Sequence, residues 1–154
     1  MAGKDDVAAV AALIGRPPSI PFEVRLRSAS GLPCVIELAP VDINGFPQSN
    51  WFWLVDKELA RAVSRLESRG GVANAAGAVS ADALDLSHRS HRRTAGRGVW
   101  GARAGVKCLH AHLAFLLAGG FSPVGVWTLY QLLLMEPSLK STALVNWRVA
   151  GPQG

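Results

Sequence analysis

The segment Gly105-Val-Lys-Cys-Leu-His-Ala-His-Leu-Ala-Phe-Leu-Leu-Ala-Gly-Gly120, followed by Phe121-Ser-Pro-Val-Gly125, sets a thiol and two imidazoles into otherwise apolar sequence. Residues 106–118 and 123–135 each predict a helix, with Ser122 as the N-cap of the second and Pro123 in its first turn. Each predicted helix is about 20 Å long, whereas the hydrocarbon core of a bilayer is about 30 Å thick. We therefore expect a helical hairpin and no transmembrane segment. Peripheral membrane contact stays an alternative to burial, because the hairpin is apolar nearly all round.

Sequence before the hairpin predicts a small antiparallel sheet. Residues 22–27 alternate apolar and charged side chains, and Ser30-Gly31 predicts a turn into a second strand at 34–39. The aromatic and β-branched run 51–55 predicts a third strand. Cys34 is expected to be a small buried residue of the second strand, with Ile36 and Leu38 on the same face.

Three helical segments accompany this sheet. Residues 57–69 carry an apolar stripe and follow Asp56, a good N-cap. A short helix is expected at 7–14, capped by Asp5 or Asp6, and another at 81–93, capped by Ser80, while the small residues of 71–80 predict a linker or a poor strand. The fold class is thus α+β, with one domain over residues 1–136 and a weakly patterned tail over 137–154.

The net charge of +5 is concentrated in one segment of the 154 residues. Between Asp85 and Glu136 there are six arginines and lysines and no acidic residue, so the net charge of the rest of the chain is −1. This distribution favours an anionic partner. We expect a phosphate-type anion where the Gly/Arg-rich loop 94–105 meets the N-terminus of helix 106–118, bound by Arg97, Arg103 and Lys107. A solvated basic loop is the alternative, and RNA or DNA would be a narrower version of the same interpretation.

Two nucleotide-binding motifs are excluded by their context. Gly96-Arg-Gly-Val-Trp-Gly101 matches the letters of a dinucleotide fingerprint, but a basic helix precedes it in place of an apolar strand. Gly101-Ala-Arg-Ala-Gly-Val-Lys107 lacks the Gly-Lys-Ser/Thr of a phosphate-binding Walker loop. Any anion binding here must therefore use a different arrangement.

The two cysteines, Cys34 and Cys108, are far apart, and no secretory signal is evident at the start of the chain. We expect a reducing, cytoplasmic location. At about 100° per residue, Cys108 and His112 would share a helix face, while His110 would point away from it. Together they suggest a metal- or thiol-dependent enzyme as the alternative to an anion-binding module.

Zinc needs four ligands, and the candidates to complete a set with Cys108 and His112 are Cys34, Asp56, His88 and His91. A Cys108–His112 nucleophilic pair is a second form of the enzyme hypothesis. The opposing interpretation is that Cys108 belongs to the core and that each histidine is simply hydrogen-bonded. Residue patterns leave these alternatives open.

Several short motifs also resemble the bacterial family catalogued as domain of unknown function 501, over roughly residues 11–135. They are Leu13-Ile-Gly-Arg-Pro17, Gly31-Leu-Pro33, Gly45-Phe-Pro47 before the Trp-Phe-Trp-Leu run, Ser64-Arg-Leu-Glu67, Gly105-Val-Lys-Cys-Leu-His-Ala-His112, Leu117-Ala-Gly-Gly120 and Pro123-Val-Gly125. The resemblance implies no activity. It implies further cysteines at two positions where this chain has Ser28 and Asp56. If those cysteines bind a metal in the family, this chain has either lost part of the site or uses Asp56 as an oxygen ligand in place of a cysteine.

Overall fold

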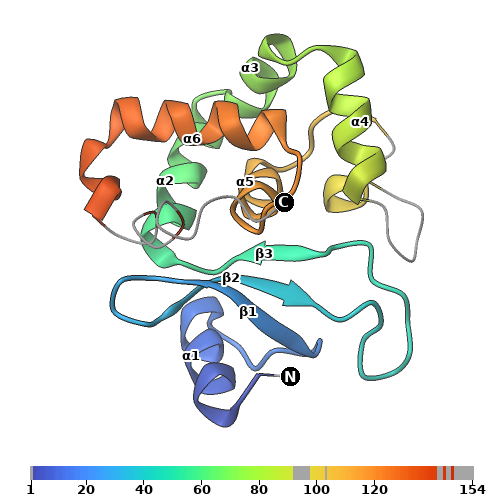
Figure 1. Cartoon of the computed structure of the whole chain (residues 1–154), viewed down its shortest axis with the longest axis vertical. Helices are drawn as coiled ribbons and strands as arrows, with labels where there is room; N and C mark the ends of the chain where they lie inside the picture. Colours follow the sequence, from blue (N-terminus) through green and yellow to red (C-terminus); the bar gives the residue numbers. More distant parts are fainter. Residues whose placement is uncertain (1, 92–97, 103, 142–143, 145–146, 148–154) are drawn as a thin grey trace.

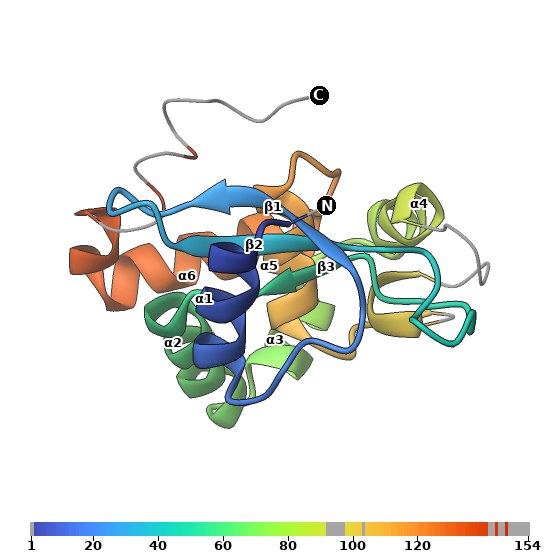
Figure 2. The same ribbon diagram turned by 90° about the horizontal axis from the view of Figure 1, so that it is seen from below.

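The structure is a computed structural model, and it describes residues 2–91, 98–102, 104–141, 144 and 147. A three-stranded antiparallel sheet has the order β1 (Phe22–Arg27), β2 (Pro33–Leu38) and β3 (Phe52–Leu54). Helix α1 (Lys4–Ile14) covers one face of this sheet, and the other helices form a layer on the opposite face (Figures 1 and 2). The α+β prediction is confirmed.

Strand β2 lies in the middle of the sheet and is buried on both faces. Its residues pair with β1 from Phe22↔Leu38 to Arg27↔Pro33, after a turn in which Gly31 has φ 88°. Ile36 and Leu38 pack toward α1, whereas Cys34 and Val35 belong to the larger core under the helical layer. Cys34 is therefore buried as expected, but it belongs to a different cluster from Ile36 and Leu38. The register of the β1–β2 pair shifts beside it, between Val24 and Arg27.

In the part of the chain that the structure describes, five α-helices build the layer above the sheet: α2 (Lys57–Ser68), α3 (Gly71–Ala78), α4 (Ala81–His91), α5 (Leu109–Leu117) and α6 (Pro123–Met135). Asp56 caps α2 by accepting a hydrogen bond from Leu59 N–H at 2.8 Å, and Ser122 caps α6 by accepting one from Gly125 N–H at 2.9 Å. Both caps confirm the predicted helix starts.

Two local predictions are wrong. Residues 71–78 form the helix α3, because Gly70 turns the chain in the left-handed region at φ 84° and the small residues that follow can pack closely. A Cβ on Gly71 would lie 2.6 Å from the carbonyl oxygen of Leu66, so this approach requires glycine. At α1 the N-cap is Gly3, and Asp5 and Asp6 lie in the first turn.

Helix α5 lies at the centre of the helical layer, between β3 and α6 (Figure 1). A Cβ on Gly125 would lie 2.6 Å from the carbonyl oxygen of His112, which explains how closely α6 approaches α5. Beyond α6, a 3-10 helix η2 spans Pro137–Ser141, and Leu139 and Leu144 are buried in the main core. Among the described residues, no helix is both long enough and apolar enough to cross a bilayer.

Candidate metal centre

The start of α5 is built by residues from two helices. Cys108 is the N-cap, with the extended backbone φ −150° and ψ 117°, so the helix itself begins at Leu109. The side chain that satisfies the first turn comes from α2: Glu67 Oε2 accepts a hydrogen bond from Leu109 N–H at 2.9 Å. This contact anchors the N-terminus of α5 to the end of α2.

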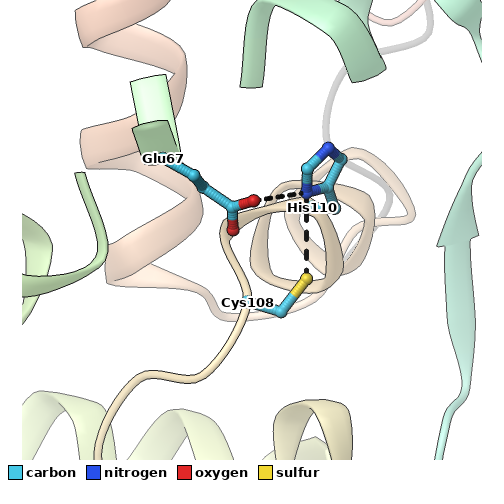
Figure 3. A group of neighbouring side chains, drawn as sticks. All are labelled: Glu67, Cys108 and His110. Carbon is cyan, nitrogen blue, oxygen red and sulfur yellow. Dashed lines mark hydrogen bonds and ion pairs between the residues drawn. The ribbon is translucent and has the colours of Figure 1, made fainter. Parts of the chain in front are cut away.

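The carboxylate of Glu67 also lies close to the side chains of Cys108 and His110, which makes a group of three potential metal ligands. Glu67 Oε1 lies 3.1 Å from His110 Nδ1, and Cys108 Sγ lies 3.9 Å from the same nitrogen. The three ligand atoms all lie within 4.8 Å of one another, and no other such group of three occurs among the described residues (Figure 3). Glu67 and His110 are each 25% exposed, so solvent reaches the group.

The other ring nitrogen of His110, Nε2, is hydrogen-bonded to residues of α2. His110 Nε2 lies 3.0 Å from the carbonyl oxygen of Ala60 and 3.1 Å from Ser64 Oγ. A carbonyl oxygen can only accept, so Nε2 carries a proton, and in the neutral ring the lone pair is on Nδ1. That lone pair faces the carboxylate of Glu67. Either a second proton on the ring or a cation between them makes this approach favourable.

Cys108 is a thiol in this environment. Burial raises the pKa of Cys108, the charge of Glu67 adds to the increase, and the backbone N–H groups of Ala111 and His110 oppose it. The raised pKa means that the sulfur is not prepared as a free thiolate nucleophile at neutral pH. Coordination of a metal ion would displace the thiol proton, because the thiolate is the form that binds metals.

One comparison with known proteins gives a match. The model of the family described as "Protein of unknown function (DUF501)" matches residues 24–95 and 81–130, and the two matches overlap. The chain belongs to this family. Glu67, Cys108 and His110 all lie inside the matched region. Neither the curated proteins nor the solved structures contain a match to this DUF501 chain.

In this DUF501 chain, the side chain that lies beside Cys108 is His110 and not the expected His112. That expectation assumed a helix over 106–118, but α5 begins at Leu109, and the extended backbone of Cys108 turns its sulfur toward His110. Asp56 is also elsewhere: its Oδ2 lies 3.5 Å from Cys34 Sγ while its Oδ1 caps α2. Burial, followed by the charge of Asp56, raises the pKa of Cys34.

His88, His91 and His112 form a separate buried cluster between α4 and α5. His88 accepts a hydrogen bond from Val99 N–H at its Nδ1 (3.0 Å), so its Nε2 donates to the carbonyl oxygen of Gly105 (2.7 Å). The rings of His88 and His112 lie 5.8 Å apart between centroids. The six candidate metal ligands named from the sequence are therefore distributed over three places in the fold.

His112 is completely buried, and among the described residues neither of its ring nitrogens has a hydrogen-bond partner. Burial first, and then the neighbouring His88 and His91, lower the pKa of His112 to about 3. The interpretation that each histidine is hydrogen-bonded is therefore not met at His112 among the described residues. The structure places His112 in the core and His110 beside Cys108.

The structure describes only part of the predicted anion site. Arg97 and Arg103 lie outside the described residues, and Lys107 is exposed. Leu109 N–H, at the N-terminus of α5, already donates to Glu67, so an external anion would have to bind beside a carboxylate. Anion binding stays a prediction.

Sequence patterns missed Glu67 as a ligand candidate. It belongs to the charged face of the helix that the apolar stripe predicts over 57–69, where a solvated carboxylate is the ordinary expectation. Its proximity to Cys108 and His110 arises from the packing of α2 on α5, which no spacing within either segment encodes. The available signal was the Cys-x-His spacing at a helix start, where the side chain of the N-cap residue can turn toward the second helical position.

Proposed function

We propose that this protein binds one divalent transition-metal ion of the zinc type through Glu67 Oε1, Cys108 Sγ and His110 Nδ1. The observation that carries the proposal is the orientation of His110. Its Nε2–H donates to the carbonyl oxygen of Ala60, and its Nδ1 is directed toward a carboxylate and a thiol. A backbone carbonyl bonded to the distal N–H is the usual arrangement that orients a metal-binding imidazole.

The separations between the atoms fit such an ion. In a tetrahedral zinc site, Zn–S of about 2.3 Å and Zn–N or Zn–O of about 2.0–2.1 Å place sulfur and nitrogen about 3.6 Å apart and nitrogen and oxygen about 3.3 Å apart. The corresponding distances here are 3.9 Å and 3.1 Å. Adjustments of a few tenths of an ångström would complete the geometry. A mixed thiolate, imidazole and carboxylate set also favours zinc over magnesium or calcium.

The fourth position of this centre would be open. Three protein ligands and a partly exposed site are typical of catalytic zinc, in which the remaining position holds water or substrate, whereas structural zinc is closed by four protein ligands. The 25% exposure of Glu67 and His110 supports this assignment. We therefore propose a metal-dependent centre that activates bound water, which is the metal form of the enzyme hypothesis, with His110 in the place expected for His112.

Metal analysis of protein purified without a histidine tag tests the proposal. One equivalent of zinc is expected, and cobalt substituted for zinc should give a thiolate-to-cobalt charge-transfer band. Cys108→Ala and His110→Ala should each abolish stoichiometric binding, whereas Cys34→Ala, which removes the other thiol, should keep the band. Absence of stoichiometric metal under zinc-replete conditions, or a band that survives in Cys108→Ala, would refute the proposal.

A further inference from the structure

The segment that leads into the proposed metal centre has no regular secondary structure. Residues 104–108 lie between the 3-10 helix η1 (Val99–Gly101) and α5, and none of them is helical or in a strand. Helix α5 holds Cys108 through its carbonyl oxygen, which accepts a hydrogen bond from His112 N–H at 3.4 Å. The bonds at a Cα atom have fixed angles, so the position of the Cys108 nitrogen determines the direction of its side chain. The incoming segment therefore sets where Sγ lies.

A buried histidine on α4 holds this segment at two points. His88 is 1% exposed. Its Nδ1 accepts a hydrogen bond from Val99 N–H at 3.0 Å, and its Nε2 donates to the carbonyl oxygen of Gly105 at 2.7 Å. The backbone at Gly98 also packs against this ring, because an added Cβ there would lie 2.3 Å from Nδ1. One ring thus connects both Val99 and Gly105 to α4.

Core packing alone does not require an imidazole at this position. Leucine fills a similar volume without polar atoms, whereas a buried imidazole is unfavourable unless its ring nitrogens are hydrogen-bonded. Both bonds of His88 go to backbone groups of another segment, and its two nitrogens have the donor and acceptor roles of one neutral tautomer. With both nitrogens engaged, His88 cannot itself bind the metal ion. Its contacts instead fix the path of the chain toward Cys108.

We propose that His88 is a positioning residue for the thiolate ligand Cys108, acting through the carbonyl group of Gly105. Only Val106 and Lys107 separate Gly105 from Cys108. Val106 packs against the main core, whereas Lys107 is exposed. The anchored carbonyl therefore leaves few backbone rotations by which Sγ could move away from the other two ligand atoms. This role rests on the proposed metal centre, and it adds a residue from α4 to a site built by α2 and α5.

Asparagine and glutamine at position 88 separate the two hydrogen bonds of the ring. The amide nitrogen of glutamine lies where Nε2 lies in histidine, so His88→Gln can still donate to Gly105. The amide oxygen of asparagine lies where Nδ1 lies, so His88→Asn can still accept from Val99 N–H but does not reach Gly105. Each variant keeps one hydrogen bond, so similar losses of stability are expected in urea denaturation. Only the glutamine variant keeps the bond that positions Cys108.

Competition titration of zinc against a chelator tests the proposal on the full chain purified without a histidine tag. His88→Asn should weaken zinc binding by about 10–100-fold, as loss of a residue that orients a metal ligand normally does. His88→Gln should bind zinc with nearly the affinity of the wild type. Cobalt-substituted His88→Asn should also show a shifted or weaker thiolate-to-cobalt charge-transfer band. Equal zinc affinities in the two variants would overturn the proposal, because a purely structural role affects both alike.

Alkylation of the metal-free protein separates this proposal from the metal centre itself. If the wild type binds no zinc, the proposed function fails, but the path of the chain can still be measured at Cys108. Iodoacetamide should modify the half-buried Cys108 several-fold faster in His88→Asn than in His88→Gln, as measured by peptide mass spectrometry. Equal rates would overturn the role of His88. If neither variant folds, nitrogen NMR of the wild type decides: the Nε2–H tautomer of His88 is expected, and the Nδ1–H tautomer would refute the proposal.

Discussion

Replacing His112 by leucine should remove a large part of the acid sensitivity of the fold. His112 is completely buried, and its pKa is lowered to about 3 from the ordinary value of 6.5. The unfolded chain therefore binds a proton at this residue over a pH range in which the folded chain does not. The stability associated with neutral His112 is fully present above pH 6.5 and is lost as the pH falls from 6.5 toward 3.

The size of the effect follows from the two pKa values. Between about pH 7.5 and about pH 5, protonation of His112 in the unfolded state should lower the free energy of unfolding by about 2 kcal/mol. This figure changes little if the folded pKa is higher by one unit, because about pH 5 still lies above it. At about pH 7.5, leucine should alter the free energy of unfolding by only about 1 kcal/mol, because it fills a similar volume and no described hydrogen bond is lost.

Urea denaturation of the wild type and of His112→Leu at both pH values measures this quantity. The wild type should lose about 2 kcal/mol more than the variant on acidification. His88 and His91 are present in both proteins, so their own titration largely cancels in the comparison. Parallel losses of stability in the two proteins would refute the assignment of His112 as a neutral buried imidazole.

Two further substitutions test other contacts. Glu67→Gln should weaken metal binding strongly while costing only about 1 kcal/mol of stability, because the amide oxygen can still cap α5; equal zinc affinity by competition titration would contradict its role as a ligand. Gly98→Ala should destabilise the fold by about 2 kcal/mol or more in thermal or urea unfolding, because its Cβ would lie 2.3 Å from His88 Nδ1. Gly77→Ala is the matched control: it lies in α3 with no atom within 4 Å of an added Cβ, so this change should stabilise the helix by about 0.5–1 kcal/mol.

Periodicity predicted β1 and α2, because each has one strongly apolar side, and the aromatic and β-branched composition of its segment predicted β3. The helix α3 was missed because its small residues have no apolar stripe, and only the close approach of Gly71 to Leu66 shows why they are small. Leu139 and Leu144 also lie in sequence with little pattern, yet both are buried in the core. Burial there depends on where the chain returns after α6, which local spacing does not encode.

The sequence analysis paired Cys108 with His112, whereas the structure places Cys108 Sγ 3.9 Å from His110 Nδ1. The helix was predicted to begin at residue 106, but α5 begins at Leu109. The prediction therefore placed Cys108 inside the helix, where each residue rotates the side-chain direction by about 100°. Once Cys108 is outside the helix, the angular argument that paired it with His112 no longer applies. The third ligand candidate, Glu67, could not be predicted from local spacing. It precedes Leu109 by 42 residues in the sequence, and the packing of α2 on α5 brings the two together.

His110 and His112 show how packing alone can separate two identical side chains on one helix. They are two residues apart on α5 and therefore point to nearly opposite sides. His110 faces α2, where a carbonyl oxygen fixes one nitrogen and a carboxylate and a thiol meet the other. His112 faces α4, where burial without a described partner keeps the ring neutral. The metal proposed at His110 would stabilise its surroundings, whereas burial at His112 opposes any positive charge. Binding of that metal and protonation of His112 would therefore affect the stability of α5 with opposite sign.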